Sequence, residues 1–339
     1  MPLLIRARQK IVYIVGRFWH IEMARKAVGS VLMSGEVELV EVSPRDGLQN
    51  ESVVLSTADK LELIDRALKA GLRRIEATSF VNPKKVPQMA DADAVMAGAV
   101  ERRTAALSVL ALNLRGVERA LAAGAVEINY VIVASNEFSI RNNGAPTWDT
   151  IRRWPEVAAM VRARSAKLGV VIGAAFGCPF EGEVPVARLS AIAEALMSHA
   201  PDEFTLADTI GVGVPADVRA RFGAMKQIVG SDVRLRAHFH NTRNTAVANA
   251  LAAYEIGVTI LDSSLGGIGG CPFAPAAAGN VATEDLVYLF ERSGVKTGVN
   301  LDVAIEAAKW VTGRLGKSAT GMVSRAGGFP HPDLKAGAA

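Results

Sequence analysis

The chain has 339 residues, half of them apolar, which is enough to bury one large domain or two ordinary ones. Its 38 basic and 34 acidic residues are spread along the sequence, so the formal charge of +4 indicates no nucleic-acid partner. No stretch approaches the roughly 20 uninterrupted apolar residues that span a bilayer, so no membrane partner is expected. The two cysteines, Cys178 and Cys271, lie far apart, which argues against a disulfide scaffold.

The first 35 residues carry six basic side chains against a single acid, Glu22. We expect residues 1–35 to form a loosely ordered extension ahead of a domain spanning residues 36–320. The same composition fits a mitochondrial-type transit peptide, or an extension upstream of an internal start such as Met33. The Ala-, Arg- and Gly-rich usage of the whole chain favours a cytoplasmic enzyme.

From residue 37 onward, short apolar runs alternate with longer segments of helical periodicity. Boundary signals support the helices: Ser56 precedes one that ends at Gly71, and Pro215 opens another that runs towards Gly230. Two further helices are predicted at 282–291 and 301–315, and a loose Gly- and Pro-rich tail at 321–339. Strands are predicted at residues 37–42, 74–78, 106–110, 127–133, 170–175, 203–206, 234–240 and 258–263.

Eight strands alternating with helices predict an α/β fold, a (β/α)₈ TIM barrel with extra C-terminal helices. A doubly wound sheet would usually have fewer strands and a Gly-rich nucleotide-binding turn after the first one. In a TIM barrel the active site lies at the carboxyl ends of the strands. The polar residues found there are therefore candidates for catalysis.

Two histidines at the end of the seventh predicted strand, His238 and His240, give the most specific signal. Residues two apart on a strand project to the same face, so both imidazoles can reach one ion. Three acids also fall near strand ends: Asp46 in the charged segment 41–51, Glu76 and Asp208. Two imidazoles with oxygen ligands favour Mg²⁺ or Mn²⁺ over a closed zinc site.

A Gly-rich loop at residues 266–280 carries Cys271 and leads to Asn280. Glycines can act as hinges of a loop that closes over substrate, and a cysteine on such a loop can serve as an acid or base. Cys271 can equally be a small apolar residue. We interpret Cys178, in the segment 176–180, as structural.

Five stretches closely resemble 3-hydroxy-3-methylglutaryl-CoA lyases, which are metal-dependent TIM barrels. They are EVSPRDGLQNE (41–51), IEATSFVNPKKVPQM (75–89), LADTIGVGVP (206–215), HFHN (238–241) and GGCPFAPAAAGNVATEDLVYLF (269–290). The resemblance runs from about residue 37 to about residue 315. It implies a retro-Claisen cleavage of 3-hydroxy-3-methylglutaryl-CoA, or a close 3-hydroxyacyl-CoA, to acetyl-CoA and acetoacetate or the corresponding 3-oxo acid. The resemblance makes leucine degradation one candidate pathway for the chain.

The resemblance also implies a role for each matching residue. Arg45 stabilises the developing enolate, and Cys271 is the acid/base group of the loop. The base that takes the hydroxyl proton stays open among Asp208, Glu76, a metal-bound group and His238. The implied metal ligands are Asp46, His238, His240 and Asn280, and the implied active-site acids are Glu41, Glu76 and Asp208. The expected substrate-binding residues are Arg45, Gln49, Ser79 and Asn142, together with Arg243, which is not part of the family pattern.

The chain departs from the pattern just beyond the histidines, where Asn241 and Arg243 replace an acid and add a cation. An added Arg can hold a carboxylate or phosphate, so the departure bears on the substrate. One alternative, which the presence of Asn241 favours, is a Claisen condensing synthase of the same barrel type. Another is a non-catalytic binding barrel. The expected partner is an acyl-CoA substrate, with a homodimer as the possible assembly.

Overall fold

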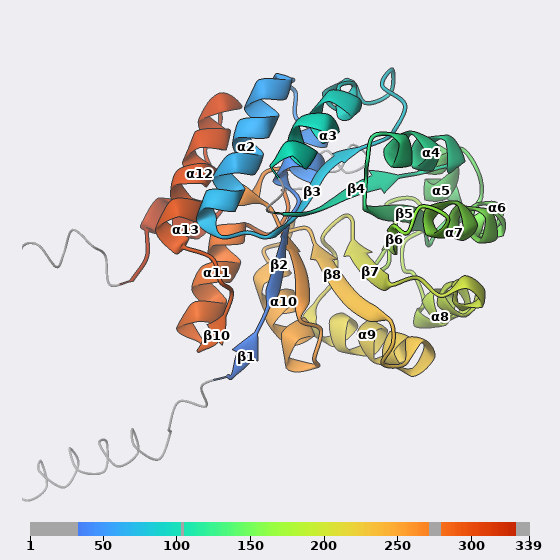
Figure 1. Cartoon of the computed structure of the whole chain (residues 1–339). Coiled ribbons are helices and arrows are strands. Elements are labelled where there is room, and N and C mark those ends of the chain that lie inside the picture. Colours follow the sequence, from blue (N-terminus) through green and yellow to red (C-terminus); the bar gives the residue numbers. More distant parts are fainter. Residues whose placement is uncertain (1–32, 103–104, 271–278, 330–339) are drawn as a thin grey trace, which may run out of the picture.

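The computed structural model describes residues 33–102, 105–270 and 279–329. Within these ranges, eight parallel strands close into a barrel in chain order, which confirms the predicted fold (Figure 1). Neighbours in the sequence are neighbours in the barrel, and the last strand pairs with the first. The strands are β2 (Glu38–Glu41), β3 (Arg74–Ser79), β4 (Ala106–Ala111), β5 (Glu127–Val133), β6 (Lys167–Gly173), β7 (Glu203–Asp208), β8 (Arg234–Phe239) and β9 (Ile260–Ser263).

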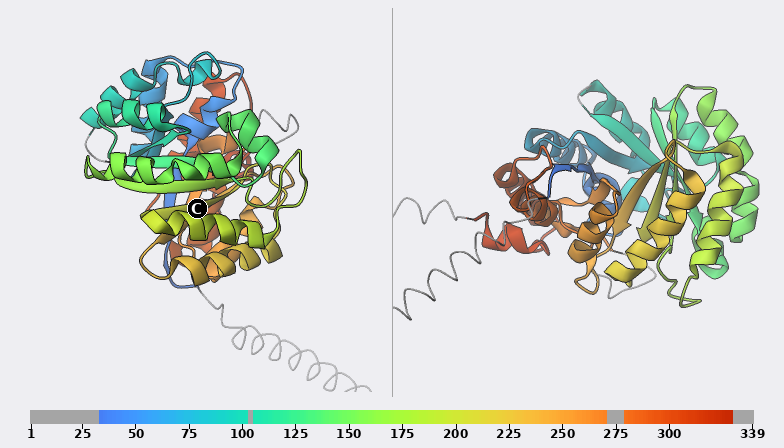
Figure 2. Two further views of the ribbon diagram at one scale, coloured as in Figure 1. Left: turned by 90° about the vertical axis from the view of Figure 1, so that its right-hand side faces the viewer. Right: turned by 90° about the horizontal axis from the view of Figure 1, so that it is seen from below.

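Helices surround the barrel, and those of the C-terminal part lie together on one side of it (Figures 1 and 2). The α-helices are α2 (Thr57–Ala70), α3 (Ala92–Glu101), α4 (Leu114–Ala122), α5 (Asn136–Asn143), α6 (Thr147–Arg152), α7 (Trp154–Arg162), α8 (Val186–Leu196), α9 (Pro215–Val229), α10 (Ala246–Glu255), α11 (Thr283–Arg292), α12 (Leu301–Arg314) and α13 (Met322–Ala326). Short turns are η1 (Ser43–Gly47, a π-helix), η2 (Pro87–Met89), η3 (Met197–His199) and η4 (Leu265–Gly267). Among the described residues, no helix is both long and apolar enough to cross a membrane.

Helix α2 shows how local sequence sets the boundaries. The Ser56 side chain accepts a hydrogen bond from the backbone of Asp59 and caps the first turn. At the other end, Gly71 has φ of 103°, a left-handed conformation that glycine adopts readily. Both ends match the predicted boundaries.

The interior of the barrel contains charged residues where a TIM barrel usually has branched apolar layers. At its amino-terminal end, Arg74 donates hydrogen bonds of 2.9 and 2.7 Å to Glu203 and another to Glu127. A small apolar cluster of Val40, Val42 and Ile260 occupies the side near β2 and β9. The main apolar core lies instead between the barrel and its helices.

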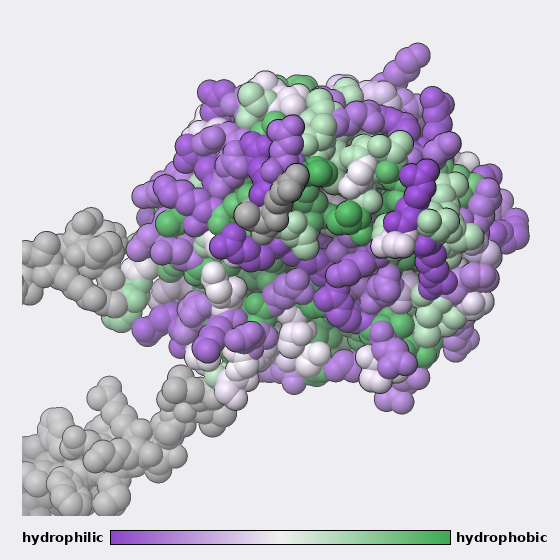
Figure 3. Space-filling view, viewed as in Figure 1, coloured by the Kyte–Doolittle hydropathy of each residue, from purple (hydrophilic) through white to green (hydrophobic). Residues whose placement is uncertain are grey.

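On the face of the molecule shown in Figure 3, hydrophobic residues gather near the middle of a largely hydrophilic surface.

Several strand ends differ from the predicted bounds by one to three residues, and the most informative differences lie at β6 and at the two ends of the domain. Strand β6 ends at Gly173 because Ala174 takes a left-handed φ of 54° and leaves the ladder. Gly35 and Glu36, placed at the junction of the predicted extension, form strand β1 and pair with β10 (Val295–Lys296). Residues 322–326, predicted as part of a loose tail, form helix α13 because the Asp285 carboxylate binds the backbone at its start.

Candidate active site

A cavity of about 130 Å³, partly open to solvent, lies at the carboxyl ends of the strands. One half of its wall, from β8 and β9 to β2 and β3, is polar, and the other half, from β4 to β7, is largely apolar. The polar half includes Arg45, Asp46, Gln49, Asn50, Glu76, Arg236, His238, His240 and Asp262. The apolar half includes Leu110, Leu112, Val131, Val133, Phe138, Val171, Gly173 and Ala207.

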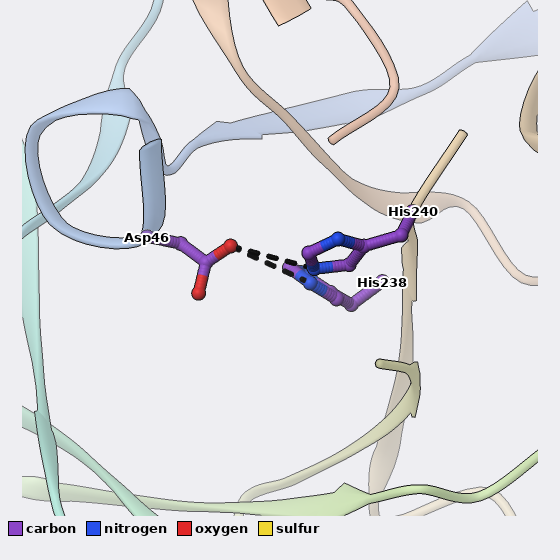
Figure 4. A group of neighbouring side chains, drawn as sticks. All are labelled: Asp46, His238 and His240. Atoms are coloured by element: carbon purple, nitrogen blue, oxygen red, sulfur yellow. Dashed lines mark ion pairs between the residues drawn. The ribbon is translucent and has the colours of Figure 1, made fainter. Parts of the chain in front are cut away.

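Asp46, His238 and His240 converge on the polar half of the wall, as predicted (Figure 4). Turn η1 carries Asp46 towards the two histidines at the end of β8. From Asp46 Oδ2, the His240 Nε2 atom lies at 3.6 Å and the His238 Nε2 atom at 3.9 Å. One ligand atom from each residue lies within 4.8 Å of the others, so one cation can contact all three.

Asn280 completes this group. Its Nδ2 atom donates to Asp46 Oδ2 over 2.8 Å, and its backbone forms an isolated bridge with His240. The Asn280 Oδ1 atom is buried and has no hydrogen-bond partner among the described residues. An orphaned buried oxygen beside a carboxylate and two imidazoles fits the oxygen-rich shell that Mg²⁺ or Mn²⁺ prefers.

The charge state of Asp46 also suits a cation. Burial opposes its ionisation, but Arg45 and the two imidazoles outweigh burial and hold the pKa of Asp46 well below its usual range. For His238, burial favours the neutral ring, whereas the hydrogen bond to Asp262 and the charge of Asp46 together raise its pKa. A cation at this site would compete with that proton for the imidazole.

Asp262, at the end of β9, fixes the orientation of His238. Its Oδ2 lies 2.8 Å from His238 Nδ1, which directs Nε2 of the ring towards Asp46. Its other oxygen accepts a hydrogen bond from Arg236 Nε. Neither Asp262 nor Arg236 was predicted as a site residue, although both occupy strand positions that face the interior.

The ionic network of the barrel interior carries more negative than positive groups. Among the described residues that it connects, the carboxylates outnumber the buried guanidiniums by two, and all of these carboxylates except the partly exposed Asp46 are buried. The exposed pair of Arg234 and Glu38 adds one charge of each sign. A divalent cation therefore fits the local charge balance. The carboxylates are Asp46, Glu76, Glu127, Glu203 and Asp262, and the guanidiniums are Arg45, Arg74 and Arg236.

Four further predicted residues lie at or beside the cavity. Glu76 Oε1 accepts a hydrogen bond from Arg45 Nε, and its Oε2 accepts one of 2.9 Å from Asn129, which the sequence did not single out. Gln49 and Asn142 both line the cavity. Ser79 lies behind Gln49 and donates to its side-chain oxygen over 3.3 Å.

The family model described as HMGL-like matches residues 36–311. The chain belongs to the HMGL-like family. It is 44% identical over 301 residues to the (R)-citramalyl-CoA lyase of Chloroflexus aurantiacus, covering 86% of this chain and 95% of that protein. To the mitochondrial hydroxymethylglutaryl-CoA lyase of Homo sapiens it is 40% identical over 290 residues, covering 86% and 89%. The predicted family and the predicted enzyme class, a carbon–carbon lyase, are confirmed.

Solved structures give the same assignment. This chain matches the hydroxymethylglutaryl-CoA lyase of Pseudomonas aeruginosa with a TM-score of 0.81 and 39% identity, and the match covers 86% of this chain and 97% of that one. It matches an HMG-CoA lyase of Acinetobacter baumannii in complex with coenzyme A and 3-methylmalate with a TM-score of 0.83 and 35% identity, covering 88% and 97%. An acyl-CoA ligand is therefore supported for the family.

Two acids predicted to be catalytic do not line the cavity of the HMGL-like protein. Glu41 is fully buried and accepts hydrogen bonds from the backbone of Ser43 and Leu265 and from the Thr283 hydroxyl. Burial raises the pKa of Glu41. These contacts connect β2 with η1, η4 and α11, which indicates a positioning residue. A catalytic role for Glu41 stays a prediction.

Asp208 is the second such acid. Its carboxylate accepts hydrogen bonds of 3.0 and 2.9 Å from the backbone of Val212 and Gly213, and burial raises its pKa. Its neighbours Ala207 and Thr209 line the cavity, whereas Asp208 does not. Asp208 therefore holds the loop between β7 and α9.

Arg243 is exposed and also holds that loop, because its Nη1 donates to the carbonyls of Ile210 and Gly211 over 3.1 and 2.9 Å. It does not line the cavity formed by the described residues, so its contact with substrate stays a prediction. The side-chain oxygen of Asn241 accepts a hydrogen bond of 3.1 Å from the backbone of Ala246 at the start of α10.

The two cysteines belong to different parts of the chain. Cys178 is buried, and its Sγ lies 2.8 Å from the Ser135 hydroxyl, in keeping with the structural interpretation. Cys271, the predicted acid/base group, lies outside the described residues.

Proposed function

We propose that the protein cleaves a 3-hydroxy-3-methylacyl-CoA thioester with a terminal carboxylate, 3-hydroxy-3-methylglutaryl-CoA or a close relative, by a retro-Claisen reaction. The hydroxyl on C3 loses its proton, its electron pair forms the carbonyl of a 3-oxo acid, and the C2–C3 bond breaks. The bonding pair moves into the thioester enolate, which is protonated to acetyl-CoA. The main support is the convergence of Asp46, His238 and His240 beside Arg45 at the cavity mouth.

The residues that would hold a divalent cation, Mg²⁺ or Mn²⁺, are Asp46, His238, His240 and Asn280. When bound, the cation would lower the pKa of the substrate hydroxyl and offset negative charge at the reacting atoms. The chain's own contribution is to keep Asp46 ionised and the His238 ring fixed by Asp262.

Arg45 is placed to stabilise the enolate. Glu76 and Asp46 bind its Nε and Nη1 atoms, which fixes the plane of the guanidinium at the cavity wall. A guanidinium held in advance need not reorganise as negative charge develops on the thioester oxygen. Among the residues left open as the base, Glu76 and His238 line the cavity and Asp208 does not.

The protonation of the enolate carbon requires an acid that closes over the substrate. We assign this role to Cys271, on the resemblance described above. The apolar half of the cavity wall would exclude water from the enolate and hold the hydrocarbon part of the substrate.

A second candidate substrate is (R)-citramalyl-CoA, because the relative of that name is 44% identical over 95% of its own length. This thioester has the same 3-hydroxy-3-methyl centre, but its carboxylate is attached directly to C3, without the intervening methylene. Its cleavage would give acetyl-CoA and pyruvate, whereas the longer substrate would give acetoacetate.

The two substrates can be compared directly. The purified protein is incubated with Mg²⁺ or Mn²⁺ and each thioester, and acetyl-CoA is measured together with acetoacetate or pyruvate. We expect metal-dependent release of acetyl-CoA, and the ratio of kcat/KM values then identifies the preferred substrate. No cleavage of either thioester, with condensation of a 2-oxo acid onto acetyl-CoA instead, would overturn the lyase assignment.

A further inference from the structure

The segment after α12, residues 317–326, contacts the backbone from which the Gly-rich loop begins. The backbone nitrogen of Thr320 donates to the carbonyl of Gly266 over 3.0 Å, and its hydroxyl donates to the carbonyl of Gly267 over 2.9 Å. Gly266 and Gly267 have φ of 73° and 62°, and a side chain on Gly267 would collide with the Thr320 hydroxyl. The segment therefore packs directly on turn η4.

Helix α11 connects this segment to η4 a second time. Glu284 Oε2 accepts a hydrogen bond of 3.1 Å from the backbone of Gly266, and its Oε1 accepts one of 2.6 Å from Ser324. Both side chains are buried, at 0% and 4% exposure, so water does not readily replace these contacts. The segment and η4 thus share one buried carboxyl group.

The contacts continue from η4 to the candidate cation site. Ile268 follows η4, and its carbonyl accepts a hydrogen bond of 3.2 Å from Asn280 Nδ2. The same Nδ2 atom donates to Asp46 Oδ2 over 2.8 Å. A shift of η4 would therefore move the Ile268 carbonyl and with it the side chain of Asn280.

A second route links the segment to the same region. Lys317 forms an ion pair with Glu51, and Glu51 accepts a hydrogen bond of 3.3 Å from the backbone of Gly269. Asn50, next to Glu51, donates to the carbonyl of Gly270 over 2.7 Å. The described start of the loop is thus held from both the C-terminal segment and the segment that follows β2.

We propose that residues 317–326 position the candidate cation site, with Thr320 and Glu284 as positioning residues that act through η4 on Asn280. The proposal rests on the proposed function, which assigns Asn280 to the cation. A purely structural role would have a different signature, because loss of the contacts would then lower the melting temperature and leave the cation site unchanged.

The test compares Thr320→Val, which removes the hydroxyl, with Thr320→Ser, which keeps it. The matched control is Thr297→Val, because the Thr297 hydroxyl donates to Glu291 over 2.7 Å away from η4. Mn²⁺ affinity is measured by titration followed by electron paramagnetic resonance, together with kcat, KM and the melting temperature of each full-length variant.

Loss of one hydrogen bond predicts about fivefold weaker Mn²⁺ binding and about fivefold lower kcat for Thr320→Val, with little change in KM. Thr320→Ser should lie within about twofold of the parent, and Thr297→Val should change only the melting temperature. Parental Mn²⁺ affinity and kcat in Thr320→Val, or equal impairment of both Thr320 variants, would overturn the proposal.

Glu284 supplies an independent pair. Glu284→Ala removes both contacts and should weaken Mn²⁺ binding more than Thr320→Val, whereas Glu284→Gln retains hydrogen-bonding groups and should weaken it less. The reverse order would contradict the proposal. If the parent cleaves neither thioester but Thr320→Val still loses Mn²⁺ affinity, the proposed function fails and the positioning role stands.

Discussion

The two halves of the cavity wall differ in the chemistry they can perform. The half formed by β8, β9, β2 and β3 carries charges that are paired with one another, and the half from β4 to β7 offers chiefly hydrocarbon. Because the strands close in chain order, each half is a continuous arc of the barrel. Under the proposed function, bond cleavage would take place against the polar arc while the apolar arc shapes and shields the substrate.

The largest expected effect is on the polar arc. Asp46→Ala removes the carboxylate shared by both histidines and Asn280, so metal-dependent turnover should fall at least about 1,000-fold. Mn²⁺ titration of the same variant should show loss of binding, and circular dichroism checks that the barrel remains folded. If the variant turns over at the parental rate, the reaction does not depend on the cation site of the polar arc.

Cys271 should affect catalysis without affecting the cation. Cys271→Ser leaves the polar arc intact but weakens the acid, so kcat should fall about 100-fold while Mn²⁺ affinity stays unchanged. The measurement is the steady-state rate beside a Mn²⁺ titration. A fully active Cys271→Ser variant would remove the acid/base role.

A substitution at Asp262 tests whether the buried hydrogen-bond partner of His238 contributes to cation affinity. Asp262→Asn can still accept a hydrogen bond from His238 but loses the charge that pairs with Arg236, so Mn²⁺ affinity should fall about 10-fold. Isothermal titration gives the affinity. If binding is unchanged, the orientation of His238 does not depend on the Asp262 charge.

The apolar arc should control selectivity by a smaller margin. A Cβ atom at Gly173 would lie 3.7 Å from Val133 Cγ2 and 3.8 Å from Thr209 Oγ1, so Gly173→Ala fits without a clash and narrows the cavity. The ratio of kcat/KM between the longer and the shorter thioester should fall about fivefold. An equal decrease of kcat/KM on both substrates would show that the apolar arc does not discriminate between substrates of different length.

Glu284 lies on neither arc, and besides its effect on Mn²⁺ affinity it should make the stability of the fold depend on pH. Burial raises the pKa of Glu284 from 4.5 to about 7, so the folded protein holds a proton that the unfolded chain releases between these values. Its contribution to stability therefore declines as pH rises from 4.5 to 7. Glu284→Gln should gain about 3 kcal/mol relative to the parent between pH 4.5 and pH 8. Urea unfolding at several pH values gives the difference, and a pH-independent difference would contradict it.

The sequence predicted the barrel and the convergence of Asp46, His238 and His240, because strand periodicity and the strand-end rule determine both. It did not predict Asp262 or Arg236, since an interior charge on a strand has no distinctive local pattern. Glu41 and Asp208 show the limit of the strand-end rule, which locates a residue but not the side to which its carboxylate turns.

The C-terminal segment shows a different limit. Its Gly-rich composition predicts a loose tail, but residues 320–326 are held by contacts with η4 and α11, far away in the sequence. Amino-acid composition indicates only the local conformational preference of a segment, and contacts with residues distant in the sequence can override that preference. Cys271 and the extension at residues 1–32 lie outside the described residues, so the predictions on them stand as predictions.

The excess of two carboxylates inside the barrel has a consequence beyond catalysis. Any cation that binds the folded chain and not the unfolded one shifts the folding equilibrium by mass action, by about 2.7 kcal/mol when its concentration is 100 times its Kd. The same ion would then relieve repulsion in the interior and protect the chain from proteolysis. The supply of divalent cation would thus set how long each copy of the protein survives as well as how fast it works.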